Sequence, residues 1–83
     1  MTYQILVYPL AKEQILILPF DALLPLAEAM TVLEMTPYVG QPYRPSNDRF
    51  RELRFGSEGV GRINYLVLDE HDRVDVLQVT WWK

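Results

Sequence analysis

The fold of this chain is decided by residues 50–82, FRELRFGSEGVGRINYLVLDEHDRVDVLQVTWW. Three runs in this stretch are rich in β-branched, aromatic and alternating apolar residues, as is typical of strands. They cover roughly Phe50–Phe55, Arg62–Leu68 and Val74–Trp82. The segments between them, GSEGVG and DEHDR, are short enough for hairpin turns. The stretch therefore predicts a three-stranded antiparallel meander.

The residues before the meander predict one further strand and two helices. Residues 2–8, TYQILVY, have the composition of a strand. Residues 9–19, PLAKEQILILP, suit a short helix, while QILIL alone would also suit a strand. The clearest helix lies within 19–37, PFDALLPLAEAMTVLEMTP, and Pro37 ends it. Residues 38–48 are rich in Pro, Gly, Ser and Asn, which predicts a loop.

These elements predict an α+β fold. An N-terminal strand and two helices precede the antiparallel meander, and the helices pack on one face of the sheet. A chain of 83 residues builds one small domain, here 1–83. Such a domain buries roughly 60–65% of its unfolded surface, so it gains stability from a partner. Its 49% hydrophobic residues exclude a disordered chain, and no tract is long and apolar enough to span a bilayer.

Composition also limits the chemistry. The chain has no cysteine, which excludes disulfides and thiolate catalysis and suits a reducing cytoplasm. The N-terminus lacks the basic start of a signal peptide, so a cytoplasmic location is expected. His71 is the single histidine, and a zinc site would need mostly carboxylate ligands. No metal and no cofactor are expected.

The positive charge is confined to the middle of an acidic chain. The net charge is −3, and the sequence pI is about 4.9. Residues 1–43 carry one Lys against four acids, giving −3, and residues 63–83 carry two basic residues against four acids, giving −2. Residues 44–62 carry five arginines against three acids, giving +2. A function that uses positive charge is therefore expected to use this segment.

Strand alternation predicts where these arginines point. Successive side chains of a strand lie on opposite faces of the sheet. If apolar side chains of the meander face the helices, the inward set includes Leu53, Phe55, Ile63, Tyr65, Val67, Leu77, Val79 and Trp81. The other face then gathers Glu52, Arg54, Arg62, Asn64, Gln78 and Thr80. Folding the hairpins sets Arg54 beside Arg62, a pairing that an anion would stabilise. An exposed salt-bridge lattice around Glu52 is the open alternative.

The motifs RELRFG and GRINYLVLDEHDRVDVLQVTW, in this order after two helices, resemble the C-terminal half of the RelE/ParE superfamily of bacterial toxins. The resemblance extends over nearly the whole chain, with YPLAKEQILILP and LAEAMTVLEMTP where the family has its two helices. It implies a toxin-antitoxin module. RelE-like members cut mRNA on the ribosome, ParE-like members inhibit DNA gyrase, and a cognate antitoxin holds both inactive.

The resemblance also suggests site residues. The family's sheet arginine falls on Arg62, and its basic pair on the preceding strand falls on Glu52 and Arg54, so one basic position is acidic here. Metal-independent RNA cleavage needs a base, cations for the phosphate and an acid for the leaving oxygen. We assign Glu52 as base, Arg54 and Arg62 as phosphate clamps and Lys83 as acid. Further nucleic-acid contacts are expected from Arg44, Arg51, Asn64, Gln78, Thr80 and Trp82.

Three functions remain open from the sequence. The first is an mRNA endoribonuclease, and the second is a ParE-like gyrase inhibitor that acts without catalysis. The acidic net charge and the C-terminal TWWK, which has no His or Tyr as acid, weigh against the first. The third is a non-catalytic interaction module with the toxin fold. In each case the apolar segment EQILILPF predicts a docking surface for an antitoxin or for a second copy of the chain.

Overall fold

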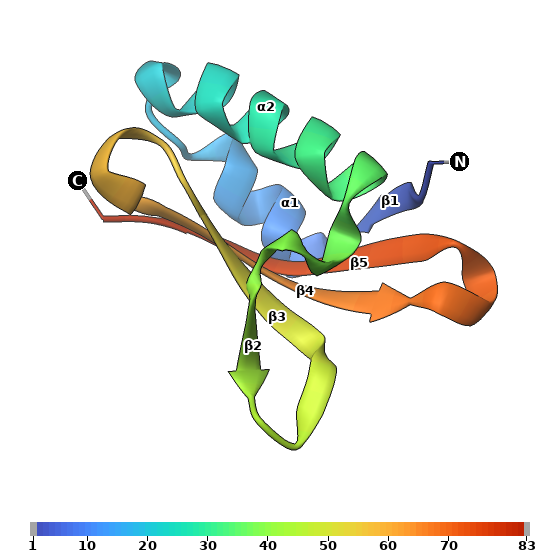
Figure 1. Cartoon of the computed structure of the whole chain (residues 1–83). Coiled ribbons are helices and arrows are strands. Elements are labelled where there is room, and N and C mark those ends of the chain that lie inside the picture. The colour runs from blue at the N-terminus through green and yellow to red at the C-terminus, as the bar shows by residue number, and fades with distance from the viewer. Residues whose placement is uncertain (1, 83) are drawn as a thin grey trace.

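A computed structural model describes residues 2–82 of the chain. Its strands form one five-stranded sheet in the order β1-β5-β4-β3-β2. Figure 1 shows both helices on the same side of this sheet. The strands are β1 (Gln4–Val7), β2 (Gln41–Arg44), β3 (Asn47–Phe55), β4 (Gly61–Leu68) and β5 (Arg73–Trp81). β1 pairs with β5 in parallel, and the other neighbours are antiparallel. The expected α+β architecture is confirmed.

The two helices form where prolines permit them. Helix α1 spans Pro9–Leu16 and begins with its proline, whose missing N–H is harmless in the first turn. This resolves the ambiguity of residues 9–19 in favour of a helix. Helix α2 spans Phe20–Met35 and buries one stripe, formed by Ala22, Leu26, Ala29 and Leu33. It ends just before Pro37, as predicted.

The expected loop at 38–48 was wrong in part. Residues 41–44 form β2, which pairs with the start of a longer β3 than the sequence predicted. A short 3₁₀ helix, η1 (Pro37–Val39), precedes β2. Pro42 lies at the outer edge of the sheet, where a missing N–H costs no strand pairing. The composition of residues 38–48 is typical of a loop, and it therefore did not reveal the edge strand.

The register of the meander agrees with the prediction at its centre. Arg54 pairs with Arg62, and Arg62 pairs with Thr80. Asn64 lies between Glu52 and Gln78. The register then shifts between Asn64 and Tyr65, because β5 contains a bulge opposite this point.

The bulge corrects one predicted core residue. Tyr65 pairs with Val76 rather than Leu77, so Leu77 is the extra residue of β5. Leu77 is half-buried and lies outside the core cluster, contrary to the inward position predicted for it. Val74 and Val76 are fully buried on the helix side instead. A bulge reverses the alternation along a strand, which the spacing of apolar residues did not reveal.

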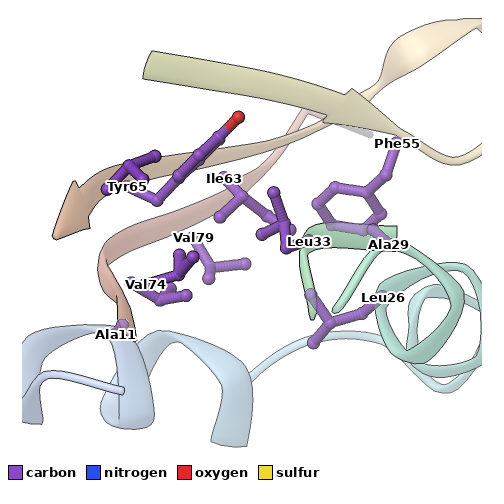
Figure 2. Close-up of a cluster of buried hydrophobic side chains, with 11 residues drawn as sticks. Ala11, Leu26, Ala29, Leu33, Phe55, Ile63, Tyr65, Val74 and Val79 are labelled. Carbon is purple, nitrogen blue, oxygen red and sulfur yellow. The ribbon is translucent and has the colours of Figure 1, made fainter. Parts of the chain in front are cut away.

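The core lies between the two helices and the inner face of the sheet. Figure 2 shows Ile63 and Val79 of the sheet beside Leu33 of α2, while the Tyr65 hydroxyl points away from Ala11 of α1. Tyr65 is fully buried, and its hydroxyl donates to the Pro37 carbonyl at 2.7 Å and accepts from the Gly40 N–H at 3.0 Å. These bonds fasten η1 to the sheet, and they satisfy a polar group that would otherwise destabilise the core.

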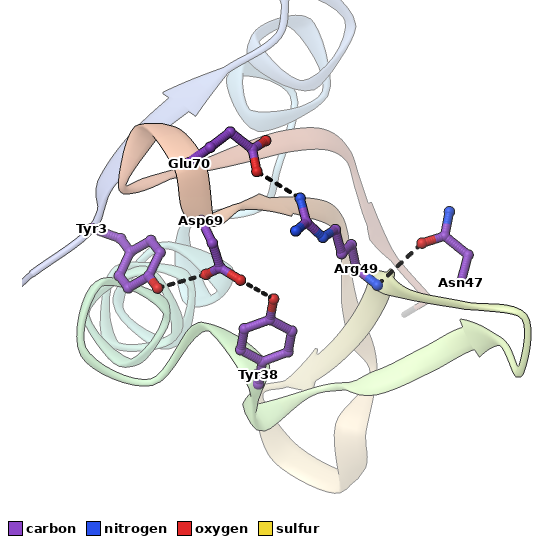
Figure 3. A network of polar contacts seen from close by, with 6 residues as sticks. All are labelled: Tyr3, Tyr38, Asn47, Arg49, Asp69 and Glu70. Atoms are coloured by element: carbon purple, nitrogen blue, oxygen red, sulfur yellow. Dashed lines mark hydrogen bonds and ion pairs between the residues drawn. The ribbon is translucent and has the colours of Figure 1, made fainter.

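A polar network ties the N-terminus to the turn between β4 and β5. Asp69 accepts hydrogen bonds from the hydroxyls of Tyr3, at 2.6 Å, and Tyr38, at 2.5 Å. Beside it, Arg49 pairs with Glu70 at 2.8 Å (Figure 3). These contacts join segments that are far apart in the sequence, and they lie away from the Arg54–Arg62 pair.

Candidate functional site

The outer face of the sheet, on the side away from the helices, carries the predicted polar cluster. Its members are Glu52, Arg54, Arg62, Asn64, Gln78 and Thr80. We call these six residues the polar face. The strand pairs of β3, β4 and β5 bring them together from positions up to 28 apart in sequence (80 − 52). The predicted juxtaposition of the two arginines is therefore confirmed, while the chemical role of each residue is untested.

The salt-bridge alternative receives little support from the geometry. The one ion pair within the polar face joins Arg54 Nε to Glu52 Oε1, and it is long at 3.8 Å. The Arg54 side chain is 61% exposed, so water screens this pair strongly. Within residues 2–82, no carboxylate lies within ion-pair distance of Arg62. Arg54 and Arg62 thus lie opposite each other with one carboxylate nearby, that of Glu52, and it makes only a long contact.

Arg62 is the more constrained of the two arginines. It is half-buried, and its Nε is shielded from solvent with no hydrogen-bond partner among the described residues. Its guanidinium carbon lies 5.8 Å from the centre of the exposed Trp82 ring, within the range of a cation–π contact. A guanidinium held in this way still presents N–H donors to an anion.

The remaining site predictions fare differently. Trp82 lies beside Arg62 and is exposed, as a base-stacking residue must be. Arg44 is exposed but lies near the start of β3, opposite Asn47. Asn47 and Arg54 are seven positions apart in β3, or roughly 24 Å at 3.4 Å per residue. Arg44 is therefore not part of the polar face, and Lys83 lies outside the described residues.

Arg51 is placed on the opposite side of the sheet from the polar face. It donates to the carbonyls of Gly40, at 2.7 and 3.1 Å, and of Tyr38, at 3.0 Å. It also donates to the Asp48 carbonyl at 2.6 Å, and its guanidinium carbon lies 5.1 Å from the Tyr38 ring centre. The side chain thus holds η1 and the start of β2 in place. Arg51 alternates with Phe50 and Glu52 along β3. This alternation is the sequence signal that its side chain lies on the inner face of the sheet.

Sequence reasoning missed a buried carboxylate on β5. Asp75 is 1% exposed and pairs with Arg73 at 2.7 Å. It also accepts a hydrogen bond from the Tyr8 hydroxyl at 3.1 Å. A charge within the apolar run RVDVLQV was the available signal, because buried acids in proteins are paired or hydrogen-bonded. Asp75 raises the pKa of Tyr8 above its usual value, mainly through this hydrogen bond, while the charge of Arg73 lowers it.

Two absences complete the description. No group of three or more His, Asp or Glu side chains within residues 2–82 is placed to hold a metal ion. No helix in the same range is long and apolar enough to cross a bilayer.

Comparison with solved structures identifies the fold. Over 98% of this chain and 99% of its counterpart, the structure matches the RelBE2 toxin-antitoxin complex of Mycobacterium tuberculosis, at 28% sequence identity and a TM-score of 0.83. It also matches a mutant of the Escherichia coli toxin RelE in the free state, with a TM-score of 0.81. This is the RelE toxin fold.

The other comparisons agree on the RelE fold. The match to free E. coli RelE has 20% identity and covers 98% of this chain and 84% of that one. An archaeal RelE-RelB complex from Pyrococcus horikoshii matches over 98% and 96% of the two chains, at 20% identity and a TM-score of 0.67. Neither a protein-family profile nor a curated protein sequence matches the chain. The resemblance to the RelE/ParE superfamily drawn from the sequence motifs is nevertheless confirmed by the structural neighbours.

Proposed function

We propose that this chain is the toxin of a bacterial toxin-antitoxin pair, held inactive in the cytoplasm by a cognate antitoxin. The observation that carries this proposal is the match over the full length of a chain in a RelBE complex. The neighbours include RelE structures with RelB antitoxin bound and without it. What this chain shares with the free RelE mutant is the fold, at a TM-score of 0.81.

We further propose that the polar face binds and cleaves RNA without a metal. Glu52 would take the proton of a 2′-hydroxyl, so that O2′ attacks phosphorus and the bond from phosphorus to O5′ breaks. Arg54 and Arg62 would stabilise the charge that grows on the phosphoryl oxygens. The leaving O5′ would take a proton from an acid, for which Lys83 is the candidate. The products would be a 2′,3′-cyclic phosphate and a 5′-hydroxyl.

The geometry supports two parts of this mechanism. Two guanidiniums from adjacent strands face the same side, where a phosphate would receive donors from both. Glu52 lies directly opposite Asn64 on the neighbouring strand, and its carboxylate makes only a long contact of 3.8 Å with Arg54. The carboxylate is thus not engaged in a short ion pair with either arginine. Trp82 would stack on a base next to the phosphate held by Arg62.

Gyrase inhibition is the second candidate, and the net charge of −3 favours it. RNA-directed proteins bind phosphate largely through positive charge, and this chain approaches the ribosome with a repulsive field. A protein target requires no such excess. A non-catalytic module with the same fold is the remaining alternative, and one experiment separates all three.

The test induces the chain alone in a bacterial host and follows incorporation of labelled amino acids and thymidine. As an endoribonuclease, the chain should stop amino-acid incorporation first, and mRNA recovered from the cells should carry new 5′-hydroxyl ends. The double variant Arg54→Ala/Arg62→Ala should lower the cleavage rate at least about 100-fold, as expected when transition-state donors are lost.

Arg49→Ala is the matched control. It also removes an arginine of β3, but one whose partner is Glu70 and which lies away from the polar face. This variant should remain active, since an exposed ion pair contributes about 0–1 kcal/mol. Early loss of thymidine incorporation would instead favour gyrase inhibition. Normal growth with soluble, folded protein would contradict both toxin mechanisms.

A further inference from the structure

A cavity opens where the turn between α1 and α2 meets the C-terminal end of β5. Its volume is about 440 Å³, within the range of pockets that hold small ligands. Gln14 of α1, Ile17 and Pro19 of the turn, and residues 79–82 line it. We call this cavity the β5 pocket. Because Trp82 lines it and also lies beside Arg62, the pocket adjoins the polar face.

The backbone of β5 is unpaired on the side that faces the pocket. β1 pairs only with residues 73–76 of β5, and no other strand among residues 2–82 lies on that side. The Trp82 N–H donates to the Val60 carbonyl at 2.9 Å, on the side of β4. Backbone groups of successive residues point to opposite sides of a strand, so the N–H and C=O of Trp81 face the unpaired edge. The pocket therefore contains a backbone donor and a backbone acceptor without a strand partner.

Gln14 closes the neighbouring part of this edge. Its Oε1 accepts a hydrogen bond from the Val79 N–H at 2.7 Å. This bond leaves the Nε2 group of the same amide as a donor at the pocket. It also blocks an added strand at Val79, so the open part of the edge is limited to Trp81. A compact ligand fits this edge, whereas an extended peptide does not.

A further polar group in the pocket wall lacks a partner. The Trp81 indole Nε1 is shielded from solvent and makes no hydrogen bond within residues 2–82. The Cζ3 and Cη2 atoms face Gly56, since a Cβ added there would lie 2.9 and 3.1 Å from them. Nε1 therefore lies on the side of the ring away from Gly56. A shielded donor without an acceptor destabilises a protein, and a ligand oxygen would remove that penalty.

We propose that the β5 pocket receives a base of the RNA substrate, beside the phosphate held by Arg62, and prefers bases whose pairing edge carries a carbonyl oxygen. This role rests on the proposed RNA cleavage and adds recognition of the base to it. Trp82 is 68% exposed, and the centre of its ring lies 5.8 Å from the Arg62 guanidinium carbon. A base stacked on this ring would therefore have its phosphate near Arg62.

Donors outnumber acceptors in the pocket. Trp81 contributes its backbone N–H and its indole N–H, and Gln14 contributes its amide N–H groups. The acceptors are the Trp81 carbonyl and the Thr80 hydroxyl. Uracil presents O4 and guanine O6 to such donors, whereas cytosine and adenine carry amino groups at these positions. An amino group opposite a donor leaves both without an acceptor, so the pocket should discriminate against cytosine and adenine.

Uridine and cytidine 3′-monophosphates test this preference, because the two nucleotides have the same size and differ at the carbonyl or amino group. Each is titrated into the whole, isotope-labelled chain and followed by NMR. The uridine nucleotide should shift the signals of the Trp81 indole N–H and backbone amide, and it should bind about tenfold or more tightly than the cytidine nucleotide. Ribose 5-phosphate, which lacks a base, should leave the Trp81 indole signal unchanged.

Ile17→Trp and Leu16→Trp are matched variants for the position of the ligand. The two neighbours are 83% and 82% exposed, and Ile17 lines the pocket whereas Leu16 does not. Ile17→Trp should obstruct the pocket and weaken binding of the uridine nucleotide about fivefold or more. Leu16→Trp should change it less than about twofold. Trp81→Phe, which removes the indole donor and keeps a ring, should reduce the ratio of uridine to cytidine affinity.

Three outcomes would overturn the proposal: equal affinities for the two nucleotides, an unchanged Trp81 indole signal at millimolar nucleotide, or wild-type affinity in Ile17→Trp. Nucleotide binding requires no RNA cleavage, so a chain that discriminates the nucleotides but leaves RNA intact would contradict the cleavage mechanism alone. Conversely, a chain that cleaves RNA through Arg54 and Arg62 without distinguishing the nucleotides would contradict only the role of the β5 pocket.

Discussion

Arg51 and Arg54 show how one strand separates two uses of the same residue type. They are three positions apart in β3, so their side chains leave opposite faces of the sheet. Arg51 is held by three backbone carbonyls, and it organises η1. Arg54 makes one long contact with Glu52 and is otherwise open to solvent. The cluster of arginines that marks this chain is therefore partly structural and partly available for binding.

Asp69 makes the fold sensitive to acid. The hydroxyls of Tyr3 and Tyr38 donate hydrogen bonds to its carboxylate. These bonds, the one from Tyr3 most strongly, lower the pKa of Asp69 below its usual value. A carboxyl whose pKa is lower in the folded state stabilises the fold above its unfolded pKa, about 3.9, and loses this contribution as pH falls through the folded pKa. We expect wild-type stability to fall below about pH 4.

Asp69→Asn tests this assignment. The variant should be less stable than wild type at pH 7, and the difference should shrink toward about pH 2, as the wild-type carboxyl takes up its proton below its unfolded pKa of about 3.9. Urea unfolding across pH measures the effect. Glu70→Gln, which removes the neighbouring carboxylate, is the control for general charge. An equal loss of stability at both pH values would show that the tyrosine bonds do not depend on ionisation.

At the scale of elements, Gly40 decides how closely β2 approaches the sheet. Its backbone is extended, so its conformation does not require glycine. A Cβ at this position would nevertheless collide with the Glu52 carbonyl and lie 2.7 Å from the Tyr65 hydroxyl. Both atoms belong to rigid elements, one to the β3 backbone and one to a fully buried ring.

Gly40→Ala should therefore destabilise the chain by about 1–3 kcal/mol, the usual cost of overpacking. The expected observation is a lower midpoint of urea unfolding with an unchanged slope. Gly59→Ala is an unsuitable control because its φ of +67° strains any side chain. Ala27→Gly, at an exposed position of α2, provides a reference of about 1 kcal/mol. A midpoint for Gly40→Ala equal to that of wild type would show that β2 can move away from β3.

The whole molecule exposes an apolar surface at the junction of α1 and α2. Leu16 and Ile17 are 82% and 83% exposed, and Phe20 is 90% exposed. The structure thus agrees with the apolar excess noted in EQILILPF. A surface of this kind marks a partner site or a tendency to aggregate.

Phe20→Lys should raise solubility and lower binding of a hydrophobic dye, with a change in unfolding free energy within about 0.5 kcal/mol. The side chain contributes little to folding because it is already in water. Phe55→Ala is the contrasting variant. Phe55 is 6% exposed and packs against Trp81 at 5.7 Å between ring centres, so its loss should cost about 3–5 kcal/mol. A large loss of stability in Phe20→Lys would contradict the exposed placement.

Local pattern was sufficient for most of the elements and for the polar face. Alternation within β3 and β4 and the short turn between them place Arg54 beside Arg62 through local geometry alone. The same reasoning failed at Leu77, because a bulge changes the alternation without changing the residue types. It also failed at β2, whose Pro42 is compatible with an edge strand that needs no outer partner.

By itself, the sequence determined the order of the helices and of the strands in the meander. It also determined which two strands bring the two arginines together, and that the rest of the chain is acidic. These follow from periodicity and from turns of a few residues, which act over short distances along the chain. Only the tertiary structure decided that β1 joins β5, that β2 stops at Glu52, and that a groove opens between α2 and β3. Such features depend on how distant segments pack against one another, because the edge of a sheet exists only once every strand has taken its place.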